Sequence, residues 1–502
     1  MLPLAILRRC IAPLLLASSA ATAQQGLYHH HLEALSSHPQ QARIAELLAA
    51  PAQGLDPALF SVTPPGGRAS VGLSNLFSAQ AGSWPFEPFA SSGLFRVIAD
   101  YQAHHPQALL LDNGSLSLAE LAQRVNDPRV LQRHKDGYLL SYPLLIGPQG
   151  ALRVENEQLY LNSRAGAAVI NRGLLILRQA KVQSWSGEQA QLSAQSFRPF
   201  IMAWAGSTTL IEGSELSRLG YNAHLARGLT SLRSQQQAAA TPAARVLIRA
   251  SQFHEMSSGA ELHDAQALIE DSSFHDLQQY GLDFSASLVS VRGNRISGVR
   301  NHSAIRLRNG SSGLISRNLL SDIGKSAIEA QLQQGALALQ GNLIGGTGAS
   351  AIALLGDPQH PVDGLLLAGN LIANSGGSGI EGQHIRRALI LDNRISSTPE
   401  YAIRIINQPA VGGSEISLLD NRLSAIGKSM INLQGVASLL LGNNSYQGMA
   451  GLQQVFDGDL LAVQSLLLET TLKHGCVAHL QVLAASQAGP PPLTAPRCGQ
   501  SI

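Results

Sequence analysis

Ionisable residues recur at a fixed spacing between residues 259 and 331. One set comprises Glu261, Asp283, Arg306 and Glu329, and a second set comprises His263, Ser285, Arg308 and Gln331. A histidine can remove a proton next to a carboxylate, and arginines can neutralise the charge that develops, so this mixture suits chemistry on a sugar acid. Glu261 and Asp283 could instead act as the two carboxyls of a glycoside hydrolase, about 5 to 9.5 Å apart. Both chemistries require the residues to share one surface.

The eight residues lie in four short phrases that alternate inward and outward positions. The phrases begin at Ala260, Leu282, Ile305 and Ile328, at intervals of 22, 23 and 23 residues. Side chains of a strand point to opposite faces with period two, so the second and fourth residues of each phrase share the outer face. A fixed period of this size indicates stacked coils. We therefore predict that the two sets form adjacent columns on one face of a right-handed parallel β-helix.

A second strand in each coil is followed by an asparagine. The series is Asn294, Asn318, Asn342, Asn370, Asn393, Asn421 and Asn443. Stacked amide side chains can hydrogen-bond along a column, and asparagine tolerates the left-handed backbone of a sharp corner. We expect these asparagines to be structural. No amphipathic helix recurs within the period, which argues against the helical repeat folds.

The composition agrees with a solenoid. The chain has 502 residues, of which 14% are charged and 5% aromatic, with 48 glycines. Low charge and many small turn-forming residues suit a fold that buries aliphatic side chains coil upon coil. The net charge of +2 argues against nucleic acid as a partner. Any electrostatic attraction to a ligand must therefore come from local clusters of charged residues.

The N-terminus has the pattern of a signal peptide over residues 1–23. Arg8 and Arg9 precede an apolar run from Ile11 to Ala17, and a small-residue cleavage site follows at Ala21-Thr22-Ala23. No later apolar stretch is long enough to span a membrane. We therefore expect an exported protein without membrane insertion. Cys476 and Cys498 then form an even pair in an oxidising compartment, which predicts one disulfide; two free thiols are the alternative.

The remaining chain divides into three parts. Residues 24–157 form a mixed α/β N-terminal region without a repeat, with a helix expected over residues 118–125. Residues 158–450 contain the β-helix, and residues 451–502 are expected to cap the end of the stack.

Several stretches resemble the periplasmic mannuronan C5-epimerases of alginate-producing bacteria. The most specific are the phrase from Arg198-Pro199-Phe200 to Trp204 and the phrase Tyr280-Gly281-Leu282-Asp283. The resemblance covers roughly residues 95 to 310. It implies conversion of D-mannuronate to L-guluronate within the polymer, in a periplasmic export assembly, with no cofactor and no metal.

The family motif differs from this chain at the catalytic histidine. The family carries Asp-Pro-His-Asp where this chain has Asp283-Phe284-Ser285-Ala286, and serine cannot replace imidazole as a base near neutral pH. The neutralising arginine of the family corresponds to Arg308 by its distance from Asn318, and to Asn309 by its distance from the start of the phrase. His263 holds the outward position of Ser285 one coil earlier, a shift of about 4.8 Å, and is the candidate for a moved base.

Three hypotheses follow from these residues. In the first, the protein is a divergent uronan C5-epimerase in which His263 is the base, Arg306 and Arg308 neutralise the substrate carboxylate, and Glu261 and Asp283 orient the histidine or bind hydroxyls. Ser285, Glu329 and Gln331 complete the polymer-binding surface. In the second, an inactive member binds or guards an acidic, polymannuronate-like polysaccharide within a periplasmic secretion complex. In the third, the protein is a lyase acting on another uronan.

Overall fold

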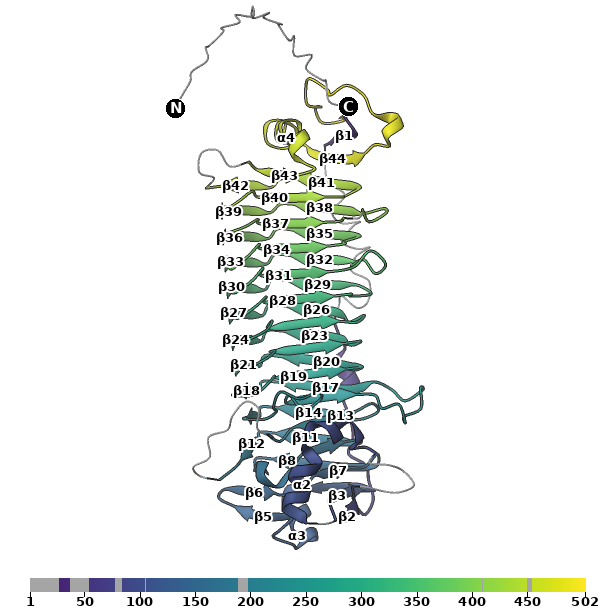
Figure 1. Ribbon diagram of the computed structural model, residues 1–502, viewed down its shortest axis with the longest axis vertical. Helices are drawn as coiled ribbons and strands as arrows, with labels where there is room; N and C mark the ends of the chain where they lie inside the picture. Colours follow the sequence, from purple (N-terminus) through teal and green to yellow (C-terminus); the bar gives the residue numbers. More distant parts are fainter. Residues whose placement is uncertain are drawn as a thin grey trace, which may run out of the picture.

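The computed structural model describes residues 27–36, 54–76, 84–103, 105–187, 197–408, 410–448 and 454–502. The segment expected to be a signal peptide lies outside these ranges. The described chain is a right-handed parallel β-helix, as predicted, in which each coil adds one strand to each of three long sheets (Figure 1). No helix within the described ranges has the length and apolar character needed to cross a membrane.

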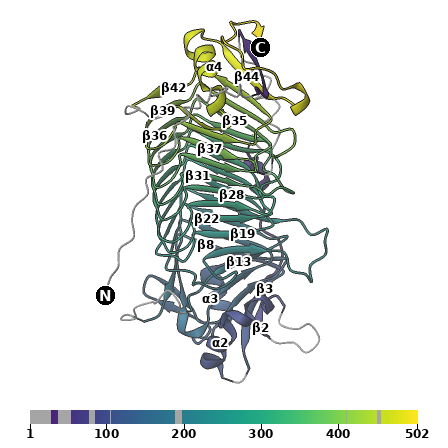
Figure 2. The same cartoon turned by 45° about the horizontal axis from the view of Figure 1, so that its top comes forward.

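The first sheet carries the phrases identified in the sequence. Figure 2 shows several of its strands stacked along the solenoid, from β13 through β19, β22 and β28 to β37. In order along the stack, its strands are β2 (Ser70–Asn75), β3 (Gln107–Asp112), β7 (Leu144–Ile146), β10 (Val169–Asn171), β13 (Ile201–Trp204), β16 (Leu229–Leu232), β19 (Ala260–His263), β22 (Leu282–Ser285), β25 (Ile305–Arg308), β28 (Ile328–Gln331), β31 (Ile352–Leu355), β34 (Ile380–Gln383), β37 (Ile403–Ile406), β40 (Ile431–Gln434) and β43 (Phe456–Gly458).

The second sheet follows the first sheet in each coil. Its strands are β4 (Gly114–Ser117), β8 (Gly150–Glu155), β11 (Leu174–Arg178), β14 (Thr208–Glu212), β17 (Ala244–Arg249), β20 (Ala265–Glu270), β23 (Leu288–Arg292), β26 (Ser312–Ser316), β29 (Leu337–Gln340), β32 (Leu365–Ala368), β35 (Arg387–Leu391), β38 (Glu415–Leu419) and β41 (Ser438–Gly442), followed by β44 (Val477–Val482), β1 (His30–Leu35) and β45 (Gln500–Ser501).

The third sheet closes each coil. Its strands are β5 (Leu131–His134), β6 (Gly137–Leu140), β9 (Gln158–Asn162), β12 (Lys181–Trp185), β15 (Glu215–Ser217), β18 (Gln252–His254), β21 (Ser273–Leu277), β24 (Arg295–Val299), β27 (Leu319–Ile323), β30 (Leu343–Thr347), β33 (Leu371–Ser375), β36 (Arg394–Thr398), β39 (Arg422–Ile426) and β42 (Ser445–Gln447).

Aliphatic columns fill the interior of the stack. The first residues of successive phrases lie directly above one another and are fully buried; they are Ala260, Leu282, Ile305, Ile328, Ile352, Ile380, Ile403 and Ile431. Burying one such aliphatic side chain stabilises the fold by about 1.5 to 3 kcal/mol. The interior is thus occupied by apolar groups, and ionisable groups of these phrases are confined to the outer face.

The asparagine ladder forms at the corner between the second and third sheets. Each side-chain amide donates to the amide oxygen one coil further on, as between Asn318 and Asn342 at 3.0 Å. The last member is Asn444, which accepts from Asn421 at 3.0 Å; the prediction of Asn443 was wrong by one residue. Asn443 itself has a φ of 52°, because the left-handed residue of this corner precedes the ladder asparagine.

The two ends of the solenoid are closed differently. Parallel strand pairing already begins at β3 and β4, well before residue 158. Helices α2 (Leu94–Gln102) and α3 (Leu118–Val125) lie at this end of the solenoid. At the other end β44 pairs antiparallel with β41, and β1, from the N-terminal segment, pairs antiparallel with β44 (Figure 1). Residues 24–157 are therefore not one unit, since strand β1 lies at the end opposite to α2 and α3.

The C-terminal segment is joined to itself by a disulfide. Cys476 and Cys498 are bonded, with Cα atoms 5.5 Å apart, beside the short helix α4 (Gln464–Leu468). The link ties the last residues of the chain to the start of β44.

Candidate functional site

The two columns expected from the sequence lie side by side on the outer face of the first sheet. Strands β19, β22, β25 and β28 pair in parallel and in the same register throughout. One column therefore contains Glu261, Asp283, Arg306 and Glu329, and the other contains His263, Ser285, Arg308 and Gln331. The spacing in the sequence predicted this register, and the remaining question is how the side chains interact.

Asp283 is held between two arginines. The guanidinium of Arg306 donates to both carboxylate oxygens, at 2.9 and 2.6 Å, and that of Arg308 approaches the same oxygens at 3.4 and 3.3 Å. The side chain of Asp283 has no exposed area. Burial raises the pKa of Asp283, but the hydrogen bonds and charges of the two arginines outweigh it and bring the pKa below its usual value. Asp283 thus positions the guanidinium groups and is not accessible to a sugar.

Aromatic stacking also holds Arg306 in place. The guanidinium carbon of Arg306 lies 4.0 Å from the ring centroid of Tyr280, and the His302 ring stacks on Tyr280 at 4.5 Å. Burial and the positive charges of Arg306 and Lys325 lower the pKa of His302. His302 is therefore neutral at neutral pH. Its ring stacks on Tyr280, which contacts Arg306, so we assign it a role in positioning the arginine and not in proton transfer.

His263 is paired with Glu261, not with Asp283. The His263 Nε2 atom lies 3.3 Å from Glu261 Oε1, and the two side chains are 12% and 3% exposed. The same carboxylate oxygen lies 3.5 Å from Arg227 and 3.9 Å from Arg308, while Oε2 is buried without a hydrogen-bond partner. A carboxylate held in this way orients an imidazole and stabilises its protonated form. None of the described hydrogen bonds uses His263 Nδ1.

Two residues of the site come from outside the repeated phrases. His224 and Arg227 belong to the segment between β15 and β16, and the ring centroid of His224 lies 6.2 Å from that of His263. Burial lowers the pKa of His224, Glu261 raises it, and the neighbouring His263, Arg227 and Arg308 lower it further, with a net decrease. Neither residue could be predicted from the repeat, because a loop has no period. The only signal was their place between the two family-like phrases, one ending at Trp204 and the other beginning at Tyr280.

The other predicted binding residues are engaged by the protein. Ser285 is buried and accepts a hydrogen bond from the Asn309 amide at 3.0 Å. Glu329 is buried and accepts from Ser303 at 2.5 Å, from Lys325 at 2.9 Å, and from Gln331. Burial raises the pKa of Glu329, but these donors bring it below its usual value.

The lowered pKa of Asp283 argues against hydrolysis by this pair of carboxylates. A glycosidase needs one protonated carboxylic acid of raised pKa. Asp283 has a lowered pKa, and both Asp283 and Glu261 are buried against cations. Asp283 is thus unsuited to supply the acid that a glycosidase needs. In the part of the chain that the structure describes, no cluster of three histidine, cysteine or acidic residues could hold a metal ion.

Known proteins support the fold and show a partial sequence similarity to one family of enzymes. The family model described as "Right handed beta helix region" matches residues 237–364. The mannuronan C5-epimerase of Pseudomonas putida is 27% identical over 207 residues, which are 39% of this chain and 40% of that protein. The mannuronan C5-epimerase of Pseudomonas fluorescens is 28% identical over 188 residues, 36% of each chain. The chain thus matches about 40% or less of the length of these relatives.

A solved structure extends the likeness along most of the stack. The crystal structure of the periplasmic alginate epimerase AlgG superposes with a TM-score of 0.63 and 16% identity, over 80% of this chain and 96% of that chain. At this identity the likeness demonstrates a common fold. In sequence, the chain is similar to mannuronan C5-epimerases over a little more than a third of its length, and in fold it is similar to AlgG over 80% of it.

Proposed function

We propose that the protein epimerises uronate residues at C5, from mannuronate to guluronate, within an exported acidic polysaccharide. The observation that carries the proposal is the His263–Glu261 pair, one coil from a carboxylate that holds Arg306 and Arg308. The names of the relatives, mannuronan C5-epimerases, supply the substrate class. The periplasm and a polysaccharide secretion complex are the setting that we propose with it.

His263 acts as the base in this proposal. With Nε2–H donated to Glu261, the neutral ring keeps its lone pair on Nδ1, which no described hydrogen bond uses. The C5–H bond breaks as its proton passes to Nδ1, and the electron pair is delocalised into the neighbouring carboxylate. The resulting imidazolium is stabilised by Glu261. Reprotonation of C5 from the opposite face, by a water on the open side of the sheet, completes the inversion.

Arg306 and Arg308 neutralise the substrate carboxylate. Both use Nε and one terminal nitrogen on Asp283, so the Nη1 groups are left for the substrate. Preorganised donors of this kind stabilise a developing enolate, and removing one typically costs about 10² to 10³ in rate. Because Asp283 is fixed by burial, the two guanidinium groups need little rearrangement when the polymer binds.

A non-catalytic role in polymer binding is the second candidate. It is favoured by one observation: Ser285 stands where the family motif has its histidine, and its hydroxyl is occupied by Asn309. In that case the arginines and His263 would retain the polymer without changing it. A lyase would share the first proton transfer but would then expel the C4 substituent.

The test is incubation of polymannuronate with the purified protein in D₂O. We expect H5 signals to be lost by exchange and guluronate signals to appear in the proton NMR spectrum. New ultraviolet absorption from unsaturated ends would identify a lyase instead. Saturable, salt-sensitive binding with no exchange would establish the non-catalytic candidate. The absence of both exchange and binding would reject the epimerase and the binding candidate for polymannuronate.

A further inference from the structure

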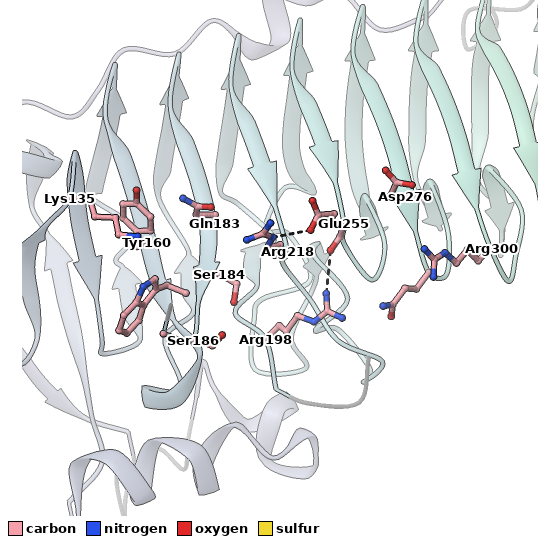
Figure 3. A pocket seen from close by; sticks show the side chains of 13 residues that line it. Lys135, Tyr160, Gln183, Ser184, Ser186, Arg198, Arg218, Glu255, Asp276 and Arg300 are labelled. Atoms are coloured by element: carbon pink, nitrogen blue, oxygen red, sulfur yellow. Dashed lines mark hydrogen bonds and ion pairs between the residues drawn. The ribbon is translucent and has the colours of Figure 1, made fainter. Parts of the chain in front are cut away.

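A second polar cavity lies away from the reacting face, at the corner where the third sheet turns into the first. Its volume is about 750 Å³, and Figure 3 shows its side chains strung along successive coils, from Lys135 and Tyr160 at one end to Arg300 at the other. Neighbouring coils lie about 4.8 Å apart. The cavity is therefore elongated along the stack, which suits an extended chain molecule more than a compact ligand.

The cavity contains a buried arginine that no carboxylate neutralises. Arg198 is 4% exposed, and its only described hydrogen bond to the protein runs from Nη1 to the backbone oxygen of Glu255 at 3.2 Å. Its Nε is buried without a partner, and the described ion pairs do not include it. Burial lowers the pKa of Arg198, and the charge of Glu255 only partly offsets this. A buried guanidinium without a counter-charge is costly, and an anion in the cavity would relieve that cost.

The remaining charges also favour an anion. Arg218 is paired with Glu255 at 2.9 Å, and Asp276 with His275 at 2.9 Å, whereas none of the described hydrogen bonds or ion pairs uses the exposed guanidinium of Arg300. The lining thus carries four cations, with Lys135 the fourth, against two carboxylates. Arg198 lies in the middle of the cavity and Arg300 at one end (Figure 3).

Residues at the left-handed corner distinguish the cavity from the rest of the third sheet. One aligned position of this sheet has positive φ in successive coils, and further along the stack it carries a short side chain, as in Gly298, Asp322, Gly346 and Asn374. Within the cavity the same corner carries Arg218 and Glu255, with φ of 59° and 54°. Long side chains are unfavourable in this conformation. Their presence here, and not further along, supports a ligand-directed role for this part of the corner.

An aromatic group forms one end of the cavity. Trp185 and Tyr160 line it, and the His134 ring packs edge-on against both, with centroids 5.1 and 5.0 Å away. The indole Nε1 of Trp185 is buried without a hydrogen-bond partner. Aromatic side chains with one polar atom suit a ring that is apolar on its face and polar at its edge, which describes a sugar. The amides of Gln183 and Gln278 offer partners for hydroxyl groups.

We propose that this cavity is a second carbohydrate-binding site, which takes a run of carboxylated sugars. Arg198 and Arg300 bind carboxylates, and Trp185 contacts a sugar ring. This proposal rests on the proposed function only for the choice of polymannuronate as the ligand. Gln278 and Arg300 lie two residues before Tyr280 and His302 in the chain. The rings of Tyr280 and His302 stack on each other, and Tyr280 contacts Arg306 of the reacting face. A polymer held in the cavity is thus retained close to the reacting face.

The test is binding of a mannuronate hexamer to the full chain carrying His263→Ala, in which the proposed base is absent. Tryptophan fluorescence reports the cavity, and the additional change Trp185→Phe identifies the part of the signal that comes from it. We expect Arg300→Ala to weaken the binding detected by Trp185 about tenfold, as for loss of one charge-assisted contact. The matched control is Arg394→Ala, an exposed arginine of the same sheet outside the cavity, with an expected change below about twofold. Arg198→Gln, checked for folding by its melting temperature, is expected to weaken binding at least as much as Arg300→Ala.

Each outcome has a distinct meaning. Binding that is unchanged in both Arg300→Ala and a folded Arg198→Gln would overturn the site, and so would equal affinity for neutral mannohexaose or for inorganic phosphate. If the wild-type protein binds with this Arg300 dependence but does not epimerise, the cavity stands and the proposed function fails. If it epimerises and the fluorescence of Trp185 does not respond to the hexamer, the proposed function stands and the cavity assignment fails.

Discussion

The coils around β22 and the coils around β34 have the same backbone fold but carry different side chains on their outer face. In the earlier coils, from β19 to β28, the outer face gathers one histidine, two arginines and three carboxylates in adjacent columns. In the later coils β31, β34 and β37 the same positions are held by Ala353, Leu355, Glu381, Gln383, Arg404 and Ile406. One ion pair remains there, between Glu381 and Arg404 at 2.6 Å. The solenoid therefore provides positions, and side chains alone decide which coils form a site.

Burial is the second difference between these regions. Asp283 has no exposed side-chain area and is shared by two arginines, whereas Glu381 and Arg404 are 22% and 32% exposed and form a single pair. A buried carboxylate fixes its partners, while an exposed pair is screened by water. The comparison predicts that equivalent changes have large effects in the earlier coils and small effects in the later ones.

The largest effect is expected from His263→Ala. Loss of the proposed base lowers the rate of epimerisation about 10³-fold, within the range typical of general base catalysis. The measurement is the rate of guluronate formation by NMR. His360→Ala, a change in the exposed insertion that follows β31, is the control and should retain the wild-type rate. Full activity of His263→Ala would exclude this residue as the base.

Asp283→Ala tests the difference in burial. It leaves two guanidinium groups without their shared carboxylate, and we expect the free energy of unfolding to fall by about 3 kcal/mol. Glu381→Ala breaks the pair of the later coils and should cost about 1 kcal/mol. Chemical denaturation measures both. Equal losses in the two variants would contradict the assigned role of burial.

Arg308→Ala and Arg404→Ala compare the same kind of residue in the two regions. We expect the first to lower the rate of epimerisation about 10²-fold, because a donor for the substrate carboxylate is lost. Arg404 lies four coils from Arg308. Its loss should change the rate less than twofold, because solvent and salt screen a surface charge over this distance. A similar fall in both variants would mean that the polymer contacts the whole face.

The smallest effect is a dependence of stability on acid pH. The pKa of Asp283 is lower in the folded chain than in the unfolded one. Its contribution to the free energy of unfolding is therefore fully present above the unfolded pKa of about 3.9 and is lost as pH falls through the folded pKa. Asp283→Asn should flatten the acid limb by up to about 1.4 kcal/mol per pH unit. Thermal denaturation at a series of pH values measures this, and an unchanged limb would speak against the arginine clamp in solution.

The sequence by itself determined the repeating features. The two columns follow from the period of 22 to 23 residues and from strand alternation, both of which are local rules repeated many times. Helix α3 over residues 118–125 follows from a local capping box between Ser117 and Glu120. The resemblance to the epimerases, and the absence of the family's histidine at Ser285, were also visible in the sequence.

Only the tertiary structure decided which side chains interact. Asp283 could have oriented His263, but its distances favour Arg306 and Arg308, and Glu261 pairs with the histidine instead. His224 and the cavity around Arg198 are contributed by loops and corners, whose length varies from coil to coil. Such contacts depend on distances between segments far apart in the chain, which no period in the sequence encodes, so the folded solenoid is needed to define them.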